Sequence, residues 1–143
     1  MQPLRYPTTR YPAALIPDLA DRHERERLSG PGLKAFFNIM ALWRVRDEDA
    51  RTLLGGVSNG PFYEMKREHG RVVDMDRLTR ISLLVGIFKA LRILHGEALA
   101  DRWIHLPNKN PIFAGQPPLA YMIQGGLPAM QVVRRLLDSR RAG

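Results

Sequence analysis

The stretch from Asp74 to His95 constrains the fold more than any other, because a helix over it would be apolar around nearly its whole circumference. It reads DMDRLTRISLLVGIFKALRILH. Its length and its charges exclude a bilayer-spanning helix, which needs ~20 mostly apolar residues. We therefore expect a central helix that other helices cover on two or more sides. Its main apolar stripe consists of Leu78, Ile81, Leu84, Val85, Phe88 and Leu91, and Leu83, Ile87, Ile93 and Leu94 widen it.

The region before this helix predicts an N-terminal arm, a charged segment and one core helix. Residues 1–17 carry four prolines, which favours an irregular arm. Residues 18–28 are charged and predict a short exposed helix with Asp18 as its N-cap. The sequence SGPG that follows predicts a break, after which Ser29 caps a new helix. The apolar face of that core helix consists of Leu33, Phe36, Phe37, Ile39, Met40 and Trp43.

Residues 46–68 predict a helix-turn-helix arrangement. Asp47 is placed to cap a short helix whose first turn is acidic. Gly55 and Gly56 end that helix, since glycine adopts the left-handed conformation without a steric penalty. Ser58 is then expected to cap a second helix.

The second helix, from Ser58 to about Glu68, is a candidate recognition helix. Such a helix places its N-terminal residues at base edges and its basic residues at phosphates. Glu64 and Glu68 oppose phosphate contact, and Gly60 and Pro61 offer no side chain for base contacts. The candidate DNA-binding residues are Ser58, Asn59, Tyr63, Lys66 and Arg67.

The chain after the central helix is predicted to be helical around one irregular loop. Gly96 breaks the chain before a short helix over residues 97–104. Four prolines, two asparagines and a glycine in residues 106–118 predict a loop without regular structure. Since no segment has the alternation of a strand, we predict an all-α fold.

Two further helices are expected at the C-terminal end. One begins at Pro118 and ends at the glycine pair 125–126, and the last begins at Pro128. The last ten residues hold four arginines against one acid, Asp138. Basic residues late in a helix suit its dipole, but this excess is larger than capping needs.

The composition excludes several classes of protein. A net charge of +8 and a pI near 10.6 favour contact with a polyanion or an acidic partner. The absence of cysteine excludes a disulfide framework and a thiolate metal site. The N-terminus lacks the apolar core of a signal peptide, so we expect a cytoplasmic protein.

No catalytic motif is present. The chain has no phosphate-binding loop, no H-E-x-x-H and no G-x-S-x-G. His23, His69, His95 and His105 are scattered and lack the spacing of metal ligands. We therefore expect no enzyme activity, no metal and no cofactor.

Motifs from Leu33 to Leu137 occur in a specific order. The segment LKAFFNIMALWRVRDEDARTLLGGVSNGPFYEMK combines a core helix, an Ala-x-x-Leu-Leu-Gly helix end and a recognition helix. The second half carries Trp103-Ile104, Pro107-Asn108, Gly115-x-x-Pro118-Leu119, Gly125-Gly126 and Val132-Val133. In these features the chain resembles antitoxins that have an Xre-like helix-turn-helix followed by an MbcA/ParS-type toxin-binding domain. Met65 departs from the pattern, because many relatives carry tryptophan there.

The resemblance implies a type II antitoxin, commonly dimeric, that binds and neutralises a cognate toxin. The usual toxin has a RES domain and targets NAD, and the C-terminal domain of the antitoxin covers its active site. The helix-turn-helix would bind operator DNA and autoregulate the operon. The expected toxin-binding residues are Trp103, Asn108, Arg134, Arg135, Arg140 and Arg141.

Together with the composition of the N-terminal region, this resemblance predicts a division of the chain into four parts. These are an arm with a charged helix (1–30), an Xre-like helix-turn-helix unit (31–73), the shared central helix (74–95) and the toxin-binding domain (96–143). The widened apolar face of the central helix supplies a predicted dimer seam at Leu83, Ile87 and Leu94. The alternatives are a transcriptional regulator without a toxin and, less favoured, a small enzyme with an unrecognised site.

Overall fold

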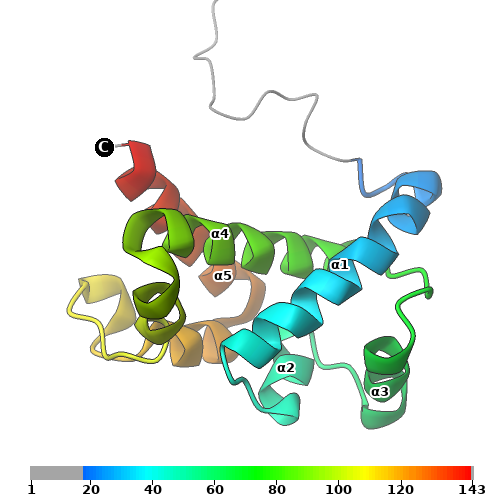
Figure 1. Cartoon of the computed structure of the whole chain (residues 1–143), viewed down its shortest axis with the longest axis horizontal. Coiled ribbons are helices and arrows are strands. Elements are labelled where there is room, and N and C mark those ends of the chain that lie inside the picture. Colours follow the sequence, from blue (N-terminus) through cyan, green and yellow to red (C-terminus); the bar gives the residue numbers. More distant parts are fainter. Residues whose placement is uncertain (1–17, 143) are drawn as a thin grey trace, which may run out of the picture.

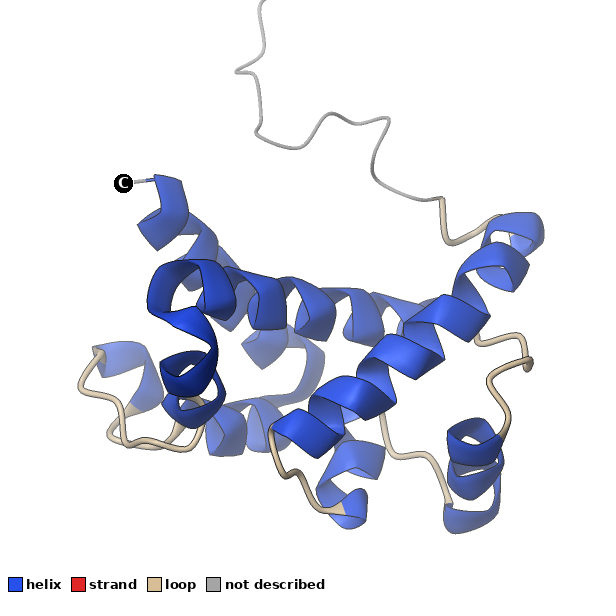
Figure 2. Ribbon diagram, in the orientation of Figure 1, coloured by secondary structure: helices blue, strands red, loops and turns tan. Residues whose placement is uncertain are grey.

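The computed structural model describes residues 18–142, and this part of the chain is all-helical (Figures 1 and 2). It contains no strand, which confirms the predicted fold class. None of its helices combines the length and the hydrophobicity that crossing a bilayer requires. The elements are α1 (Arg22–Leu42), α2 (Asp47–Leu53), α3 (Asn59–Arg67), α4 (Met75–Trp103), the short 3-10 helix η2 (Pro111–Phe113) and α5 (Pro118–Ala142).

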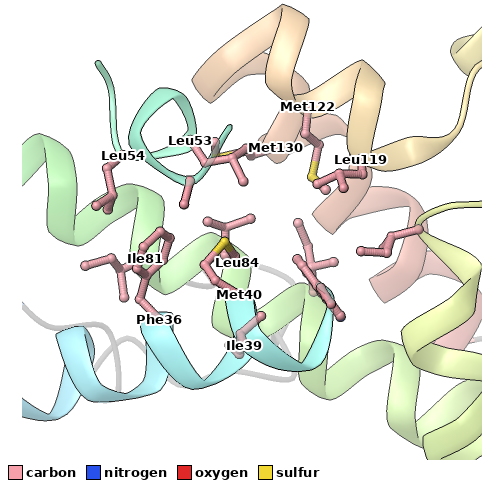
Figure 3. Packing of buried hydrophobic residues seen from close by; sticks show 14 of the residues in the cluster. Phe36, Ile39, Met40, Leu53, Leu54, Ile81, Leu84, Leu119, Met122 and Met130 are labelled. Carbon is pink, nitrogen blue, oxygen red and sulfur yellow. The ribbon is translucent and has the colours of Figure 1, made fainter. Parts of the chain in front are cut away.

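Helix α4 is the centre of the fold, as its sequence predicts. It packs against α1 and against α5, while α2 contacts α5 and α3 contacts α1 (Figure 1). A single hydrophobic core runs between these helices. Figure 3 shows part of this core, with Phe36, Ile39 and Met40 of α1, Ile81 and Leu84 of α4, Leu53 and Leu54 at the end of α2, and Leu119, Met122 and Met130 of α5.

Two glycines bend the long helices at the positions where the sequence predicts breaks. Gly96 has φ 74° and ψ 170°, and α4 changes direction there. Gly126 has φ 66° and ψ −146°, and α5 bends before Pro128. Both conformations are costly for a residue with a Cβ. The N-cap of α4 is Asp74, whose carboxylate accepts a hydrogen bond from the Arg77 N–H at 3.0 Å.

The predicted break at residues 29–32 is wrong, because α1 runs through it without interruption. Ser29 is 2% exposed and lies inside the helix instead of capping it. Its hydroxyl donates to the Arg25 carbonyl at 2.5 Å and accepts from the Val73 N–H at 2.8 Å. A Cβ at Gly30 would lie 3.2 Å from the His69 carbonyl oxygen. The small residues are therefore needed where the connector after α3 crosses α1.

The N-terminal cap is also displaced from its predicted position. Asp21, and not Asp18, is the N-cap of α1, and its carboxylate accepts from the His23 N–H at 2.9 Å. The predicted proline-rich arm, residues 1–17, lies outside the described residues.

The predicted dimer seam is wrong at its central residue. Ile87 is 0% exposed within a single chain and has no surface to offer a partner. Leu83 and Leu94 are half-buried and pack against the same core. Most of the apolar face of α4 is used inside one chain, because α1 and α5 cover two sides of it, while Ile93 remains exposed.

Candidate functional site

Two short helices, α2 and α3, are joined by a turn in which Gly55 and Gly56 have positive φ. The acidic residues of α2 act differently from expectation. Arg46 occupies the N-cap position of α2 and makes no side-chain cap, so the predicted cap at Asp47 is wrong. The Asp47 carboxylate instead reaches across to α3. It accepts a hydrogen bond from the Tyr63 hydroxyl at 3.1 Å and pairs with the Lys66 ammonium at 3.1 Å.

The start of α3 is also bonded to α2. The Arg51 guanidinium donates to the Asn59 side-chain oxygen and, at 3.0 Å, to the Val57 carbonyl. Ser58 stands at the N-cap of α3, exposed and without a side-chain cap bond. Arg67 is exposed in the last turn of the helix.

The helix-turn-helix face is not a basic patch. Residues 47–68 hold five acidic and three basic side chains, and Glu64 pairs with Arg71 at 2.8 Å. Three of the five predicted DNA-binding residues, Asn59, Tyr63 and Lys66, are bonded to α2. Binding to phosphate would have to replace these contacts. The contacts were not predictable from local sequence patterns, because the bonded partners lie 8 to 19 residues apart in the chain.

Trp103 supports the C-terminal loop from inside. It is 9% exposed, and its ring meets that of Phe113 edge to face at a centroid distance of 6.1 Å. Phe113 is fully buried and makes a second edge contact with Tyr121 at 5.2 Å. The predicted toxin-binding tryptophan is therefore a core residue that anchors the loop and offers little surface to a partner.

The loop itself is held by hydrogen bonds within it. The Asn108 side-chain oxygen accepts from the Asn110 N–H at 2.9 Å, and the Asn108 N–H donates to the Gln116 carbonyl at 3.3 Å. The Leu119 N–H donates to the Ile104 carbonyl at 2.9 Å and closes the base of the loop. Asn108 thus shapes the loop, which presents a preorganised surface.

The four predicted arginines of α5 differ in their surroundings. Arg134 is half-buried and pairs with Asp138 at 2.9 Å, and Arg141 is half-buried and engaged within the molecule. Arg135 and Arg140 are exposed. In Figure 1 the end of α5 lies apart from the loop of residues 106–117, so the predicted toxin-binding residues do not form one patch.

A cavity of about 500 Å³ lies where the end of α1 meets the end of α4, and sequence reasoning did not predict it. Its residues come from two positions in the chain separated by more than fifty residues, so no local pattern marks them. The lining residues are Leu42, Trp43, Arg44, Asp101, Arg102, His105 and Leu106. Among residues 18–142 no three His, Asp or Glu side chains cluster in a way that would hold a metal ion.

Comparison with known proteins relates the chain to a protein family. No protein-family model matches the chain. It is 38% identical over 112 residues to "Uncharacterized protein y4oB" of Sinorhizobium fredii (strain NBRC 101917 / NGR234), and this match covers 78% of the chain and 84% of y4oB. At this identity and coverage, the chain belongs to the same family as y4oB.

Proposed function

We propose that the protein is a non-enzymatic antitoxin that binds a cognate RES-domain, NAD-targeting toxin and covers its active site. As a second activity it binds operator DNA and represses its own operon. It uses no cofactor in either role, and both activities take place in the cytoplasm. The proposal rests first on the order of motifs in the sequence and next on the surfaces described above.

The observation that carries the proposal is the internally bonded loop of residues 106–117. Internal hydrogen bonds and the buried Trp103–Phe113 ring pair hold it, and Ile112 of this loop remains exposed. A surface that is already ordered loses little conformational entropy when a partner binds. This arrangement suits a protein that blocks another by docking on it.

The basic end of α5 supports the same role. Arg135 and Arg140 are exposed there, in a chain whose net charge is +8. Exposed charges of one sign steer an oppositely charged partner and raise the association rate. We therefore propose that the toxin surface facing α5 is acidic.

Operator binding by α3 requires a rearrangement of its side chains. Lys66 and Tyr63 would have to exchange the Asp47 carboxylate for DNA phosphates. The ion pair is solvent-exposed, and such pairs contribute only ~0–1 kcal/mol, so several phosphate contacts can offset its loss. DNA binding is therefore proposed as the weaker of the two activities.

A homodimer is proposed, with its interface away from Ile87. Ile93 is 64% exposed and is the most exposed large apolar side chain in the described part of the chain. Ile93→Glu would lower the mass measured by light scattering if α4 forms the interface. An unchanged mass would place the interface on another surface.

The experiment that tests the antitoxin proposal is co-expression with the toxin encoded by the neighbouring reading frame. The full chain is expected to restore growth and cellular NAD. Truncation after Leu94 is unsuitable, because it removes Trp103, Phe113 and Met130 from the shared core. The test variant is Ile112→Glu combined with Arg135→Glu and Arg140→Glu. Its control is Met75→Glu. Met75 is exposed and is the first residue of α4, whereas the loop follows the last residue of that helix.

The outcome separates the candidate functions. The triple variant should lose protection while its thermal midpoint stays unchanged, and the control should protect fully. Full protection by a folded triple variant would contradict docking through the loop and the exposed face of α5. If the wild-type chain fails to protect, or if no toxin gene adjoins it, the alternative of a helix-turn-helix regulator without a toxin is favoured.

A further inference from the structure

The cavity between the ends of α1 and α4 combines apolar and cationic walls. Leu42 and Leu106 both line it and are each 42% exposed, so two apolar side chains lie together at the same opening. Arg44 and Arg102 line the same cavity and are exposed. The His105 ring nitrogen Nε2 donates to the Trp43 carbonyl at 2.6 Å. This bond ties the two walls together, so the cavity is part of the fixed structure.

The cationic character of the cavity is not cancelled by its one acidic lining residue. Both carboxylate oxygens of Asp101 are bonded to the Arg92 guanidinium, at 2.7 and 3.1 Å. That guanidinium is itself held over the Phe88 ring, 3.9 Å from its centroid. Arg44 and Arg102 have no acidic partner among residues 18–142. Two cations therefore face a space lined by two exposed leucines.

Arg44 is placed at the cavity by an unfavourable backbone conformation. Helix α1 ends in a Schellman motif, in which the Arg44 N–H donates to the Ala41 carbonyl at 3.1 Å and the Val45 N–H to the Met40 carbonyl at 2.9 Å. Arg44 occupies its left-handed position with φ 53°. Glycine is the usual residue there, because a Cβ is disfavoured in this conformation. An arginine at this point lowers stability and brings a guanidinium to the cavity.

We propose that this cavity is a docking site for a segment of a partner protein in which acidic and aliphatic residues alternate. Its carboxylates would pair with Arg44 and Arg102, and its aliphatic side chain would pack between Leu42 and Leu106. A nucleic acid would satisfy the arginines but would leave both leucines against a polar backbone. The site goes beyond the antitoxin proposal, because it does not depend on the partner being a toxin.

The test is a titration of the ¹⁵N-labelled full chain with a synthetic hexapeptide that alternates glutamate and leucine. The expected result is saturable shifts of the Arg44, Arg102 and His105 amide signals. The same peptide with glutamine for glutamate should bind at least roughly tenfold more weakly, as expected when about 1.4 kcal/mol of charge pairing is lost. A single-stranded DNA oligonucleotide is titrated in parallel.

Arg44→Gly separates binding from folding. It should weaken peptide binding roughly fivefold to tenfold, while its thermal midpoint stays equal or rises because glycine suits the left-handed position. Lys34→Ala removes one positive charge from an exposed position on α1 and is the matched control. Unchanged peptide affinity in Arg44→Gly, shifts confined to other residues, or shifts with DNA but not with the peptide would each overturn the proposal.

Discussion

The guanidinium of Arg134 lies directly on the backbone of α4 at Gly86. A Cβ built on Gly86 would overlap the Nη1 atom of Arg134 and would come within 3.1 Å of its Nε. Gly86 is buried in the middle of a helix, where glycine is normally unfavourable. The glycine leaves room for the Arg134 guanidinium between α4 and α5. Asp138, one turn further along α5, holds the same guanidinium at 2.9 Å.

Gly86→Ala should destabilise the protein by up to about 2 kcal/mol. Alanine favours the helix by ~1 kcal/mol over glycine, but its methyl group would displace the guanidinium and strain the packing, which typically costs ~1–3 kcal/mol. Urea denaturation of the single variants and of Gly86→Ala with Arg134→Ala measures the coupling. The alanine should become neutral or stabilising once Arg134 is removed. Equal destabilisation in both backgrounds would show that the overlap does not determine the effect.

Ser29→Ala should destabilise the fold by about 1–3 kcal/mol, the cost of an unsatisfied buried donor. The Ser29 hydroxyl accepts from the Val73 N–H, and both residues are buried. Its loss leaves that N–H without a partner. The Val73 amide should also exchange faster with deuterium. Ser82→Ala, at an exposed position of α4, is the control and should have little effect.

Asp47→Asn should strengthen binding to DNA by roughly threefold to tenfold, if α3 contacts DNA. The change removes one negative charge from the face and releases Lys66 and Tyr63 to contact phosphates. Fluorescence anisotropy with an operator fragment at fixed salt measures the effect. Glu26→Gln removes one acid from the exposed surface of α1 and should leave DNA affinity nearly unchanged. Weaker binding by Asp47→Asn would mean that the pair with Lys66 orders α3 for DNA recognition.

Lys66→Ala and Arg67→Ala should weaken DNA binding equally for all sequences. Phosphate contacts carry no sequence information, and each one lost should reduce the salt slope of the affinity by up to ~1. The measurement is the dissociation constant at several salt concentrations. A slope equal to that of the wild type would remove α3 from the interface.

The helices themselves were largely predictable from the sequence. The period of apolar residues in α4 and the proline at the start of α5 depend on neighbours within one or two turns, which a local pattern records. The bends at Gly96 and Gly126 were predictable for the same reason. Ser29 shows the limit of this reasoning. The sequence Ser-Gly-Pro-Gly predicts a break in the helix. In the structure Ser29 and Gly30 instead lie where the segment around His69 and Val73 crosses α1, and this contact accounts for their small side chains.

The sequence by itself therefore determined an all-α chain built around one central helix that is apolar around nearly its whole circumference. Only the tertiary structure decided which side chains remain available for contact. Asp47 binds Lys66, Trp103 packs against Phe113, and Ile87 is fully buried. Each of these facts depends on residues brought together by packing or by pairing between separate helices. Periodicity and capping act over a few residues and contain no information about such pairs, whereas burial and ion pairing are set by the folded arrangement.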